Sequence, residues 1–542
     1  MAGVLAATSL AAMPGRSWAQ MGEPVVETAQ GRLAGLLDAD GVASFRGVRY
    51  ARAQRFMPPQ PPESWAGVRA ARQFGASAPQ TNASPPPGPP YVITAQIPRP
   101  EGAPPPPPPL PEDEACQFLN IWTAALGHQV RRPVMVWLHG GLFYGGSGST
   151  IDGSALAASG EVVVVSLNHR LNAFGFTWLG DFDADFAHSG NAGMLDIIAA
   201  LRWLKQNIAA FGGDPERITV FGTSGGGMKA AFLMASPAAA GMVQRAAAQS
   251  GPALRFMEVE QARRATHALF AALDLPQGDV RALQQVPAAR LLAAYHSVAA
   301  QMRASRFIDL PCFAPVVDGD LLVQHPFAPQ PAPQTRAIPM VLGWNAQEMS
   351  FFMGADPAGF TLDESGLETR MQGLFGERAA GLLALYRQAY PKASPSRLWI
   401  QAHSDYSIML PVMAQASRRA AAADTHGGAD SFVYRLDFQS PALGGKLGAL
   451  HTLEANLLFN TPRAGTAVLG EGPGPELLAA RMSAAWARFA HTGVPDSGLA
   501  DVPEWSRFDL ASQNVMVFDE QCRIEGDPSA AVRAAMADML DA

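Results

Sequence analysis

Uninterrupted apolar runs recur along the chain from about residue 133. They read PVMVWLHG, EVVVVSLN, RITVFG, QRAAAQSG, IPMVLGWN and SFVYRLDF, and each ends in a glycine or a polar turn. Strands that other elements cover on both faces have this pattern, because neither side of such a strand meets water. These runs therefore predict the strands of a mostly parallel central sheet.

Helical segments lie between these runs, for example NAGMLDIIAALRWLKQNIAAF at residues 191–211. Alternation of strands and helices predicts an α/β fold, with a sheet flanked by helices. In such folds the ligand site lies beyond the carboxyl ends of the strands, so the turns that follow the apolar runs are where chemistry is expected.

Two segments ahead of these elements have a different character. Residues 24–45 alternate short β-like runs with glycine turns, which predicts a small N-terminal antiparallel sheet. Residues 84–111 are saturated with proline and predict a stiff surface loop, since proline suits neither a helix interior nor a central strand. A linker between two domains is the alternative. We favour a loop over one domain that spans residues 21–542.

The composition excludes several classes of protein. Hydrophobic residues make up 48% of the 542 positions and charged residues 16%, which suits a large core and not a disordered chain. The net charge of −7 argues against a nucleic-acid partner. No apolar run reaches the roughly 18–20 residues of a membrane-spanning helix, so no transmembrane segment is expected.

No cofactor or metal is expected either. The three cysteines are far apart in the sequence, which fits neither a disulfide framework nor a zinc site. The chain has no HExxH motif, no complete phosphate-binding loop and no dinucleotide fingerprint with its acidic partner. The sequence carries no signal for an oligomeric state, and we expect a monomer.

The first twenty residues have features of an export signal. AGVLAATSLAAM is apolar, and Ser17-Trp18-Ala19 follows it as a small-x-small cleavage site, although the positively charged start is missing. We expect a truncated signal peptide over residues 1–20 and a periplasmic or secreted protein. The alternative is an alanine-rich terminus of a cytoplasmic protein.

Ser224 lies in the pentapeptide Gly-Thr-Ser-Gly-Gly, directly after the strand-like RITVF and before the helical MKAAFLMAS. This strand–turn–helix context is what a nucleophile elbow requires, because glycines allow a turn tight enough to expose the serine hydroxyl. The pentapeptide alone also fits a flexible glycine turn. Its context favours Ser224 as a nucleophile.

A serine nucleophile needs a histidine base, which in this kind of fold comes last in the chain. His403 lies in a helical stretch, His426 precedes a strand, and His491 follows a helix. His451 follows the strand SFVYRLDF through a glycine-rich loop, so it emerges at the carboxyl end of the sheet. We therefore expect His451 to be the base.

The acid that orients the histidine is expected between the serine and the histidine. Glu348 lies just beyond the strand IPMVLGWN, at the carboxyl end. Asp318 and Asp320 come before that strand, in VVDGD, and fit a turn. Glu348 is the better candidate.

The oxyanion that forms on attack needs fixed N–H donors. One is expected from Gly225, the residue after the nucleophile. The others are expected from the HGG-type loop in WLHGGLFYGG, which follows a strand and contains Gly141 and Leu142.

From about residue 26 to the C-terminus, the chain resembles the type-B carboxylesterase and cholinesterase family. The resemblance rests on FRGVRYARAQRFMPP, EACQFLNIW, VMVWLHGG, VVVVSLNHRLNAFGF, GNAGMLDIIAALRWLKQNIAAFGGDPERITVFGTSGGG, FAPVVDGDLL, GWNAQE and LGALHTLEANLLF, which occur in the family's order. It implies an α/β-hydrolase fold, a triad of Ser224, Glu348 and His451, and oxyanion donors at Gly141, Leu142 and Gly225. It also implies two ion pairs, Arg170 with Asp196 and Arg55 with Glu114.

Several departures from the family pattern bear on the substrate. Thr223 replaces the glutamate of the usual Gly-Glu-Ser-Ala-Gly, and Leu142 replaces a glycine of the usual HGGG. The 84–111 segment contains no tryptophan to bind a quaternary ammonium. Met349, Phe351 and Phe352 follow Glu348 at once and are expected to line the acyl side of the pocket.

These features predict a serine carboxylesterase that hydrolyses small, neutral, moderately hydrophobic esters through an acyl-enzyme. Two alternatives stay open at this point. The same triad would hydrolyse amides or carbamates, and a cholinesterase-like chain can also be a non-catalytic binding or adhesion module. Retention of all three triad residues argues against the second.

Overall fold

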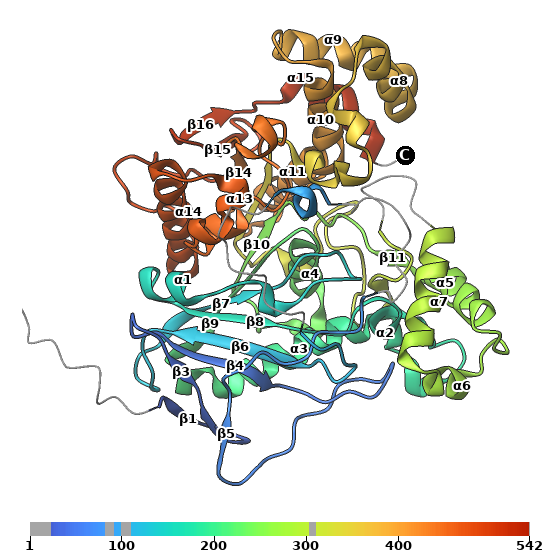
Figure 1. Ribbon diagram of the computed structural model, residues 1–542, viewed down its shortest axis with the longest axis vertical. Coiled ribbons are helices and arrows are strands. Elements are labelled where there is room, and N and C mark those ends of the chain that lie inside the picture. The colour runs from blue at the N-terminus through green and yellow to red at the C-terminus, as the bar shows by residue number, and fades with distance from the viewer. Residues whose placement is uncertain (1–22, 82–91, 99–109, 303–309, 541–542) are drawn as a thin grey trace, which may run out of the picture.

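The computed structural model describes residues 23–81, 92–98, 110–302 and 310–540 (Figure 1). Its centre is an eleven-stranded sheet with the strand order β16-β15-β14-β13-β10-β9-β7-β8-β6-β4-β3. The strands are β3 (Leu36–Leu37), β4 (Ala43–Arg49), β6 (Phe118–Thr123), β7 (Arg132–Trp137), β8 (Val163–Leu167), β9 (Gly213–Thr223), β10 (Arg245–Gln249), β13 (Met340–Asn345), β14 (Ser431–Leu436), β15 (Asn514–Phe518) and β16 (Arg523–Gly526).

The middle of this sheet is parallel from β8 to β15, and antiparallel strands lie only toward its edges. In register, Trp137 of β7 pairs with Phe221 of β9, and Gln249 of β10 pairs with Thr223 of β9. All six apolar runs singled out in the sequence form strands of this parallel part. The predicted α/β architecture with a mostly parallel sheet is confirmed.

Both faces of the sheet are buried, which explains the apolar runs. Val134 and Val136 of β7 join one core, whereas Met135 and Trp137 of the same strand join the other. Helices α3 (Ala192–Asn207), α4 (Gly225–Ala235) and α11 (Leu410–His426) contribute to the first core. Helices α1 (Ser154–Ser159) and α14 (Pro473–Thr492) contribute to the second.

The remaining helices lie around this layered centre (Figure 1). Helices α8, α9 and α10 gather at the top of the view, and α5, α6 and α7 at its right. The elements are α2 (Asn172–Phe176), α5 (Val259–Ala272), α6 (Val280–Gln285), α7 (Ala288–Gln301), α8 (Glu364–Phe375), α9 (Ala379–Ala389), α10 (Pro395–Ser404), α12 (Ala455–Leu458), α13 (Thr466–Leu469) and α15 (Ala530–Met536), with a short strand pair β11 (Met257–Glu258) and β12 (Val316–Val317).

The N-terminal segment divides between two sheets. β1 (Val25–Thr28) and β2 (Gly31–Ala34) pair antiparallel in the small sheet that the sequence predicts. β5 (Val68–Ala70) joins β2 in parallel, and β3 and β4 extend the large sheet. The predicted signal peptide at residues 1–20 lies outside the described residues, as does most of the proline-rich segment 84–111. Export, the monomeric state and the single domain stay predictions.

Where the chain is described, no helix combines the length and the apolar character needed to cross a bilayer.

The two ion pairs that the family resemblance implies are present. Arg170 and Asp196 form a two-pronged pair with N–O distances of 2.7 and 2.8 Å, and both side chains are buried. Arg55 also meets Glu114 through two contacts, but the Glu114 side chain keeps 30% of its exposure. Only the first pair is removed from water, so only there would the loss of one partner leave an isolated buried charge.

Candidate active site

The predicted site residues meet at one edge of the large sheet. Strands β7, β9, β13 and β14 run parallel, so the loops that follow them emerge at the same edge. These loops carry the HGG-type segment, Ser224, Glu348 and His451, in that order along the chain.

Ser224 occupies a sharp turn between β9 and α4. Its backbone has φ 60° and ψ −126°, a strained conformation for a residue with a side chain. Its N–H donates to the carbonyl oxygen of Gln249 on the neighbouring β10 at 2.7 Å. A side chain on Gly226 would fall 2.0 Å from the carbonyl oxygen of Leu138, so this position requires glycine. The surrounding strands and glycines hold the turn in place and leave Ser224 partly exposed.

Glu348 and His451 are in direct contact, although 103 positions separate them in the sequence. The Nδ1 of His451 lies 2.5 Å from Oε2 of Glu348, and both side chains are buried. A proton on Nδ1 leaves the other ring nitrogen, Nε2, as an acceptor. Nε2 of His451 has no hydrogen-bond partner in the described part of the chain. The acid therefore orients the ring and leaves Nε2 free to accept a proton.

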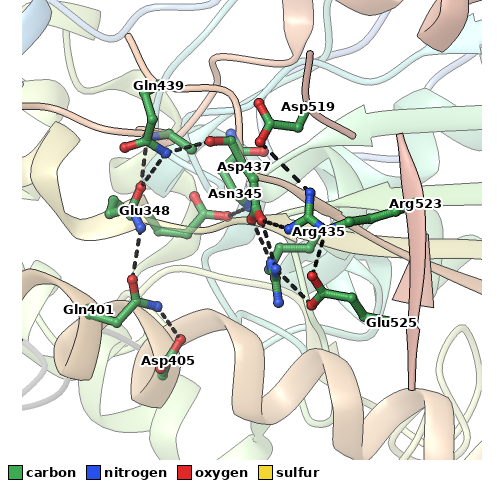
Figure 2. Close-up of polar contacts among 12 residues, drawn as sticks. Asn345, Glu348, Gln401, Asp405, Arg435, Asp437, Gln439, Asp519, Arg523 and Glu525 are labelled. Atoms are coloured by element: carbon green, nitrogen blue, oxygen red, sulfur yellow. Dashed lines mark hydrogen bonds and ion pairs between the residues drawn. The ribbon is translucent and has the colours of Figure 1, made fainter. Parts of the chain in front are cut away.

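The loop that carries Glu348 is held by hydrogen bonds on several sides. The backbone N–H of Asn345, the last residue of β13, donates to Oε1 of Glu348 at 2.7 Å. The side chain of Gln347 donates to Gln401 at 2.8 Å, and Gln401 in turn donates to Asp405 at 2.9 Å. Figure 2 shows Gln401 and Asp405 on one side of this loop and Gln439 on the other. The carboxylate that orients His451 is thus fixed by the β13 backbone and by a buried polar network.

The HGG-type loop lies against the nucleophile turn. A side-chain carbon on Gly140 would lie 3.5 Å from Cβ of Ser224, and one on Gly225 would lie 2.6 Å from the backbone nitrogen of Leu142. Within the described residues, the N–H groups of Gly141 and Leu142 donate no hydrogen bond. Gly225 opens α4, where N–H groups have no partner inside the helix. Three backbone donors therefore lie beside Ser224 with free bonding capacity.

Ser224 and His451 both line one cavity of about 1530 Å³. Pockets for small molecules commonly span about 300–1,000 Å³, so this cavity has room for a bulky substrate. Its described wall carries seven aromatic residues other than histidine: Phe74, Trp137, Tyr144, Tyr295, Phe351, Phe352 and Phe459. Apart from histidines, Arg46 is the basic residue and Asp152 the acidic residue of that described wall, so their formal charges cancel.

The apolar side chains that follow Glu348 in the sequence line the cavity. Met349, Phe351 and Phe352 all line the cavity. The rings of Phe351 and Phe352 lie 5.6 and 5.1 Å from the His451 ring, measured between centroids. They form an apolar wall directly beside the histidine.

Comparison with known proteins gives the family. The model of the carboxylesterase family matches residues 22–533. The chain belongs to the carboxylesterase family. Para-nitrobenzyl esterase from Bacillus subtilis is 32% identical over 526 residues, which cover 95% of this chain and 98% of that one. This chain is a carboxylic ester hydrolase that acts on small-molecule esters.

Solved structures agree with this assignment. Carboxylesterase EST55 from Geobacillus stearothermophilus matches with a TM-score of 0.78 and 35% identity, over 94% of this chain and 99% of that chain. An esterase from Clostridium hathewayi, described as able to hydrolyse aliphatic aromatic polyesters, matches with a TM-score of 0.79 and 30% identity, over 95% and 98% of the two chains. These neighbours confirm the α/β-hydrolase fold.

One buried residue beside the carboxylesterase site escaped the sequence reasoning. Glu454 follows His451 by three positions and is fully buried. It accepts hydrogen bonds from Thr223 Oγ1 at 2.5 Å and from Asn345 Nδ2 at 2.7 Å. Burial, and then the nearby carboxylate of Glu348, raise the pKa of Glu454. Thr223 therefore brings no carboxylate of its own to the nucleophile, but its hydroxyl binds one.

Leu142 and Gly225, two departures from the family pattern, touch each other. Leu142 has φ 48°, which is uncommon for a residue other than glycine. A side-chain carbon on Gly225, where the family pattern has alanine, would lie 2.4 Å from Cα and from the carbonyl oxygen of Leu142. Glycine at 225 is what lets the leucine loop approach this closely.

Of the residues set aside in the sequence, His426 and Asp318 lie as expected, whereas His491 belongs to α14 and does not follow it. His403 is on α10, and its ring lies 4.9 Å from the Trp399 ring, tilted by 38°. Burial lowers its pKa to about 4, although the residue also lines the cavity. His426 ends α11, and His491 in the last turn of α14 meets the carbonyl oxygen of Gly160. Asp318 accepts two backbone N–H bonds from its own turn, as expected.

Across the described residues, no group of three or more histidine, cysteine, aspartate or glutamate side chains is arranged to hold a metal ion.

Proposed function

We propose that this carboxylesterase hydrolyses neutral, moderately hydrophobic esters through an acyl-enzyme on Ser224, with His451 as base and Glu348 as the orienting acid. The observation that carries the proposal is the 2.5 Å contact between His451 Nδ1 and Glu348 Oε2, on the wall of the cavity that Ser224 also lines. The free Nε2 of His451 supports its role as the base.

In the proposed first half-reaction, Ser224 Oγ attacks the ester carbonyl carbon while His451 Nε2 takes the hydroxyl proton. The carbonyl oxygen becomes an oxyanion that accepts hydrogen bonds from the N–H groups of Gly141, Leu142 and Gly225. Collapse of the tetrahedral intermediate breaks the bond to the alcohol oxygen, and His451 returns its proton to that oxygen. Glu348 keeps Nδ1 protonated and stabilises the imidazolium that forms meanwhile.

In the second half-reaction a water molecule takes the place of the alcohol. His451 removes a proton from this water, which attacks the acyl carbon, and the same donors bind the second oxyanion. Collapse of this second intermediate breaks the bond between the acyl carbon and Ser224 Oγ, and His451 returns its proton to that oxygen. The acid then leaves, and Ser224 is back in its starting state. The apolar wall of Met349, Phe351 and Phe352 suits the acyl part, and the balanced charges of Arg46 and Asp152 suit a neutral substrate.

Hydrolysis of a chromogenic short-chain ester by the wild type and by Ser224→Ala tests the proposal. We expect the variant to lose at least about 10³-fold in kcat while keeping its fold, because the base and acid have no nucleophile to act on. Near-normal hydrolysis by Ser224→Ala would refute the proposal. The matching anilide and carbamate, run in parallel, test whether the same residues act on amides or carbamates instead.

A further inference from the structure

Lys229 is a buried charged residue that the proposed mechanism does not use. It lies on α4, five residues after Ser224, and its side chain is fully buried. Its Nζ donates a hydrogen bond to the backbone carbonyl oxygen of His139 at 2.8 Å. No carboxylate forms an ion pair with it among the described residues. Burial of an ammonium group without a carboxylate partner costs desolvation free energy, so a lysine at this position reduces the stability of the fold unless its charge has a use.

The groups around Lys229 bring no carboxylate to compensate its charge. The rings of His139 and His169 stack with centroids 4.9 Å apart, and each Nδ1 donates to a backbone carbonyl oxygen. Burial, and then the charge of Lys229, lower the pKa of both rings, that of His139 to about 3, so both are neutral at ordinary pH. The ring of Phe143 lies 5.7 Å from Nζ. Arg170, next to His169, is already paired with Asp196.

The other elements packed on α4 bring no free acid to Lys229 either. Asp196 on α3 is taken by Arg170, and Lys205 on α3 pairs with Glu216 of β9. The remaining charged residues of α3, β9 and β10 are Arg202, which is exposed, and Asp214, Arg217 and Arg245, near the amino ends of their strands. Burial lowers the pKa of Lys229 to about 7.

The acceptor of Lys229 is the start of the proposed oxyanion loop. His139 directly precedes Gly140, Gly141 and Leu142, and the last two have φ of 81° and 48°. A loop in such a conformation is kept only where its surroundings over-determine it. Lys229 lies on α4, which begins with Gly225. Its hydrogen bond to His139 therefore links the loop that carries the N–H groups of Gly141 and Leu142 to the helix that carries the N–H group of Gly225.

We propose that Lys229 is a positioning residue of the oxyanion hole, whose protonated ammonium fixes the His139 carbonyl and thereby the N–H groups of Gly141 and Leu142. This inference rests on the proposed function. It assigns a role that depends on charge, because an ammonium binds a carbonyl oxygen more strongly than a neutral amine does.

The proposal sets the sign of a pH effect. Lys229 is protonated below its pKa and neutral above it. Its contribution to kcat is therefore present on the acid side and lost as pH rises through about 7. The wild type is expected to show a falling alkaline limb in kcat.

The experiment compares Lys229→Met with Lys392→Met, which changes an exposed lysine in the loop before α10. A short-chain ester is followed by pH-stat titration across acid, neutral and alkaline pH. Inhibition by a trifluoromethyl ketone is measured in parallel. The serine hydroxyl adds to the carbonyl carbon of this ketone, and the resulting anionic oxygen occupies the oxyanion hole. Thermal unfolding checks that both variants fold.

We expect Lys229→Met to lower kcat at acid to neutral pH by about tenfold or more, with little change in KM, because the misplaced donors act in the transition state. Affinity for the ketone falls by a similar factor, and the alkaline limb in kcat disappears. Lys392→Met keeps all wild-type values.

A Lys229→Met variant with wild-type kcat and an unchanged alkaline limb would overturn the inference. If this variant does not fold, the pH profile of the wild type is sufficient. A wild-type kcat without an alkaline limb would also overturn the inference. Ser224→Ala, assayed beside these variants, distinguishes a failure of the proposed function from a failure of the role proposed for Lys229. Activity that survives in Ser224→Ala refutes the proposed function, whereas its loss together with a normal Lys229→Met refutes only the role of Lys229.

Discussion

At the scale of single residues, Glu348 is held more tightly than its role as a partner of His451 requires. One oxygen meets the histidine, and the other accepts the N–H of Asn345. A glutamine at this position would keep the shape of the side chain but would lose the charge that stabilises the imidazolium of His451. It would also favour the wrong tautomer of the His451 ring.

We therefore expect Glu348→Gln to lower kcat by about 10³-fold or more, as expected for the orienting acid of a triad. Asp318→Asn is the matched control, because Asp318 bonds its own turn and Asn191. Steady-state kinetics on one ester settle the comparison. Near-full activity in Glu348→Gln together with its loss in Asp318→Asn would mean that the acid is assigned wrongly.

A second residue-scale prediction concerns Gly225. A methyl group there would overlap the backbone of Leu142, so either the loop or the start of α4 must move. We expect Gly225→Ala to lower kcat by about 10²-fold, because both sides of the clash carry proposed oxyanion donors. Gly381→Ala, on an exposed face of α9 with open space around it, is the control and is expected to keep full activity. Wild-type kcat in Gly225→Ala would contradict this account of the hole.

The sequence predicts some of these residues and misses others for physical reasons. Ser224, Glu348 and His451 could be proposed because each follows an apolar strand, and strand ends are visible in the sequence. Glu454 gives no such signal, since its importance comes from Thr223 and Asn345, which reach it only after folding. Lys229 leaves a faint trace, a lysine inside the apolar segment MKAAFLMA.

At the scale of elements, the loop that carries Glu348 depends on a helix from another part of the chain. The contacts from Gln347 through Gln401 reach Asp405, which begins a short π-helix (Asp405–Met409) between α10 and α11. Asp405 also accepts the hydroxyl of Tyr386 on α9 at 3.0 Å. Irregular turns of this kind often lie at functional sites.

Burial raises the pKa of Asp405 to about 7 from its ordinary 3.8, which makes stability depend on pH. Between these values the folded chain keeps a proton that the unfolded chain has lost. This group therefore lowers the unfolding free energy as pH rises from about 4 to about 7. We expect Asp405→Asn to lack this part of the pH dependence, since asparagine does not titrate.

Urea unfolding at a series of pH values measures this effect. Asp424→Asn, which changes an exposed aspartate on α11, is expected to keep the wild-type dependence. If Asp405→Asn followed the same pH dependence as the wild type, Asp405 would not be the titrating group.

Helices and strands can be predicted from the sequence where burial alone determines the pattern of apolar residues. The six apolar strands are examples. The extent of the small sheet is harder to predict from the sequence. β3 and β4 continue the glycine-rich pattern of β1 and β2, but they pair with the large sheet. Which sheet a short edge strand joins depends on tertiary pairing that a local pattern does not contain. The same limit applies to the π-helix at Asp405, which no local pattern of the sequence predicts.

At the scale of the whole molecule, the cavity sets the substrate class that we propose. Its described wall is rich in aromatic side chains, and the formal charges of Arg46 and Asp152 cancel. Leu142 adds bulk beside the nucleophile. These features favour a neutral ester with an unbranched or aromatic acyl part over a cationic or strongly branched one.

We expect kcat/KM for a choline ester to be lower than for its uncharged isostere, because the ratio reports differential binding of the transition state. Leu142→Gly is expected to improve branched acyl esters more than unbranched ones. A clear preference for the cation would contradict the proposed substrate class. Branched esters that gain nothing from Leu142→Gly would remove the steric argument.

The central claim is that Ser224 carries the acyl group between the two half-reactions. Rapid quenching of the wild type with an activated ester, followed by peptide mass spectrometry, tests it most directly. We predict one acyl group per chain, on the peptide and residue of Ser224, and none on the same peptide of Ser224→Ala. An acyl group on another side chain, or turnover with no acylated Ser224, would contradict the account.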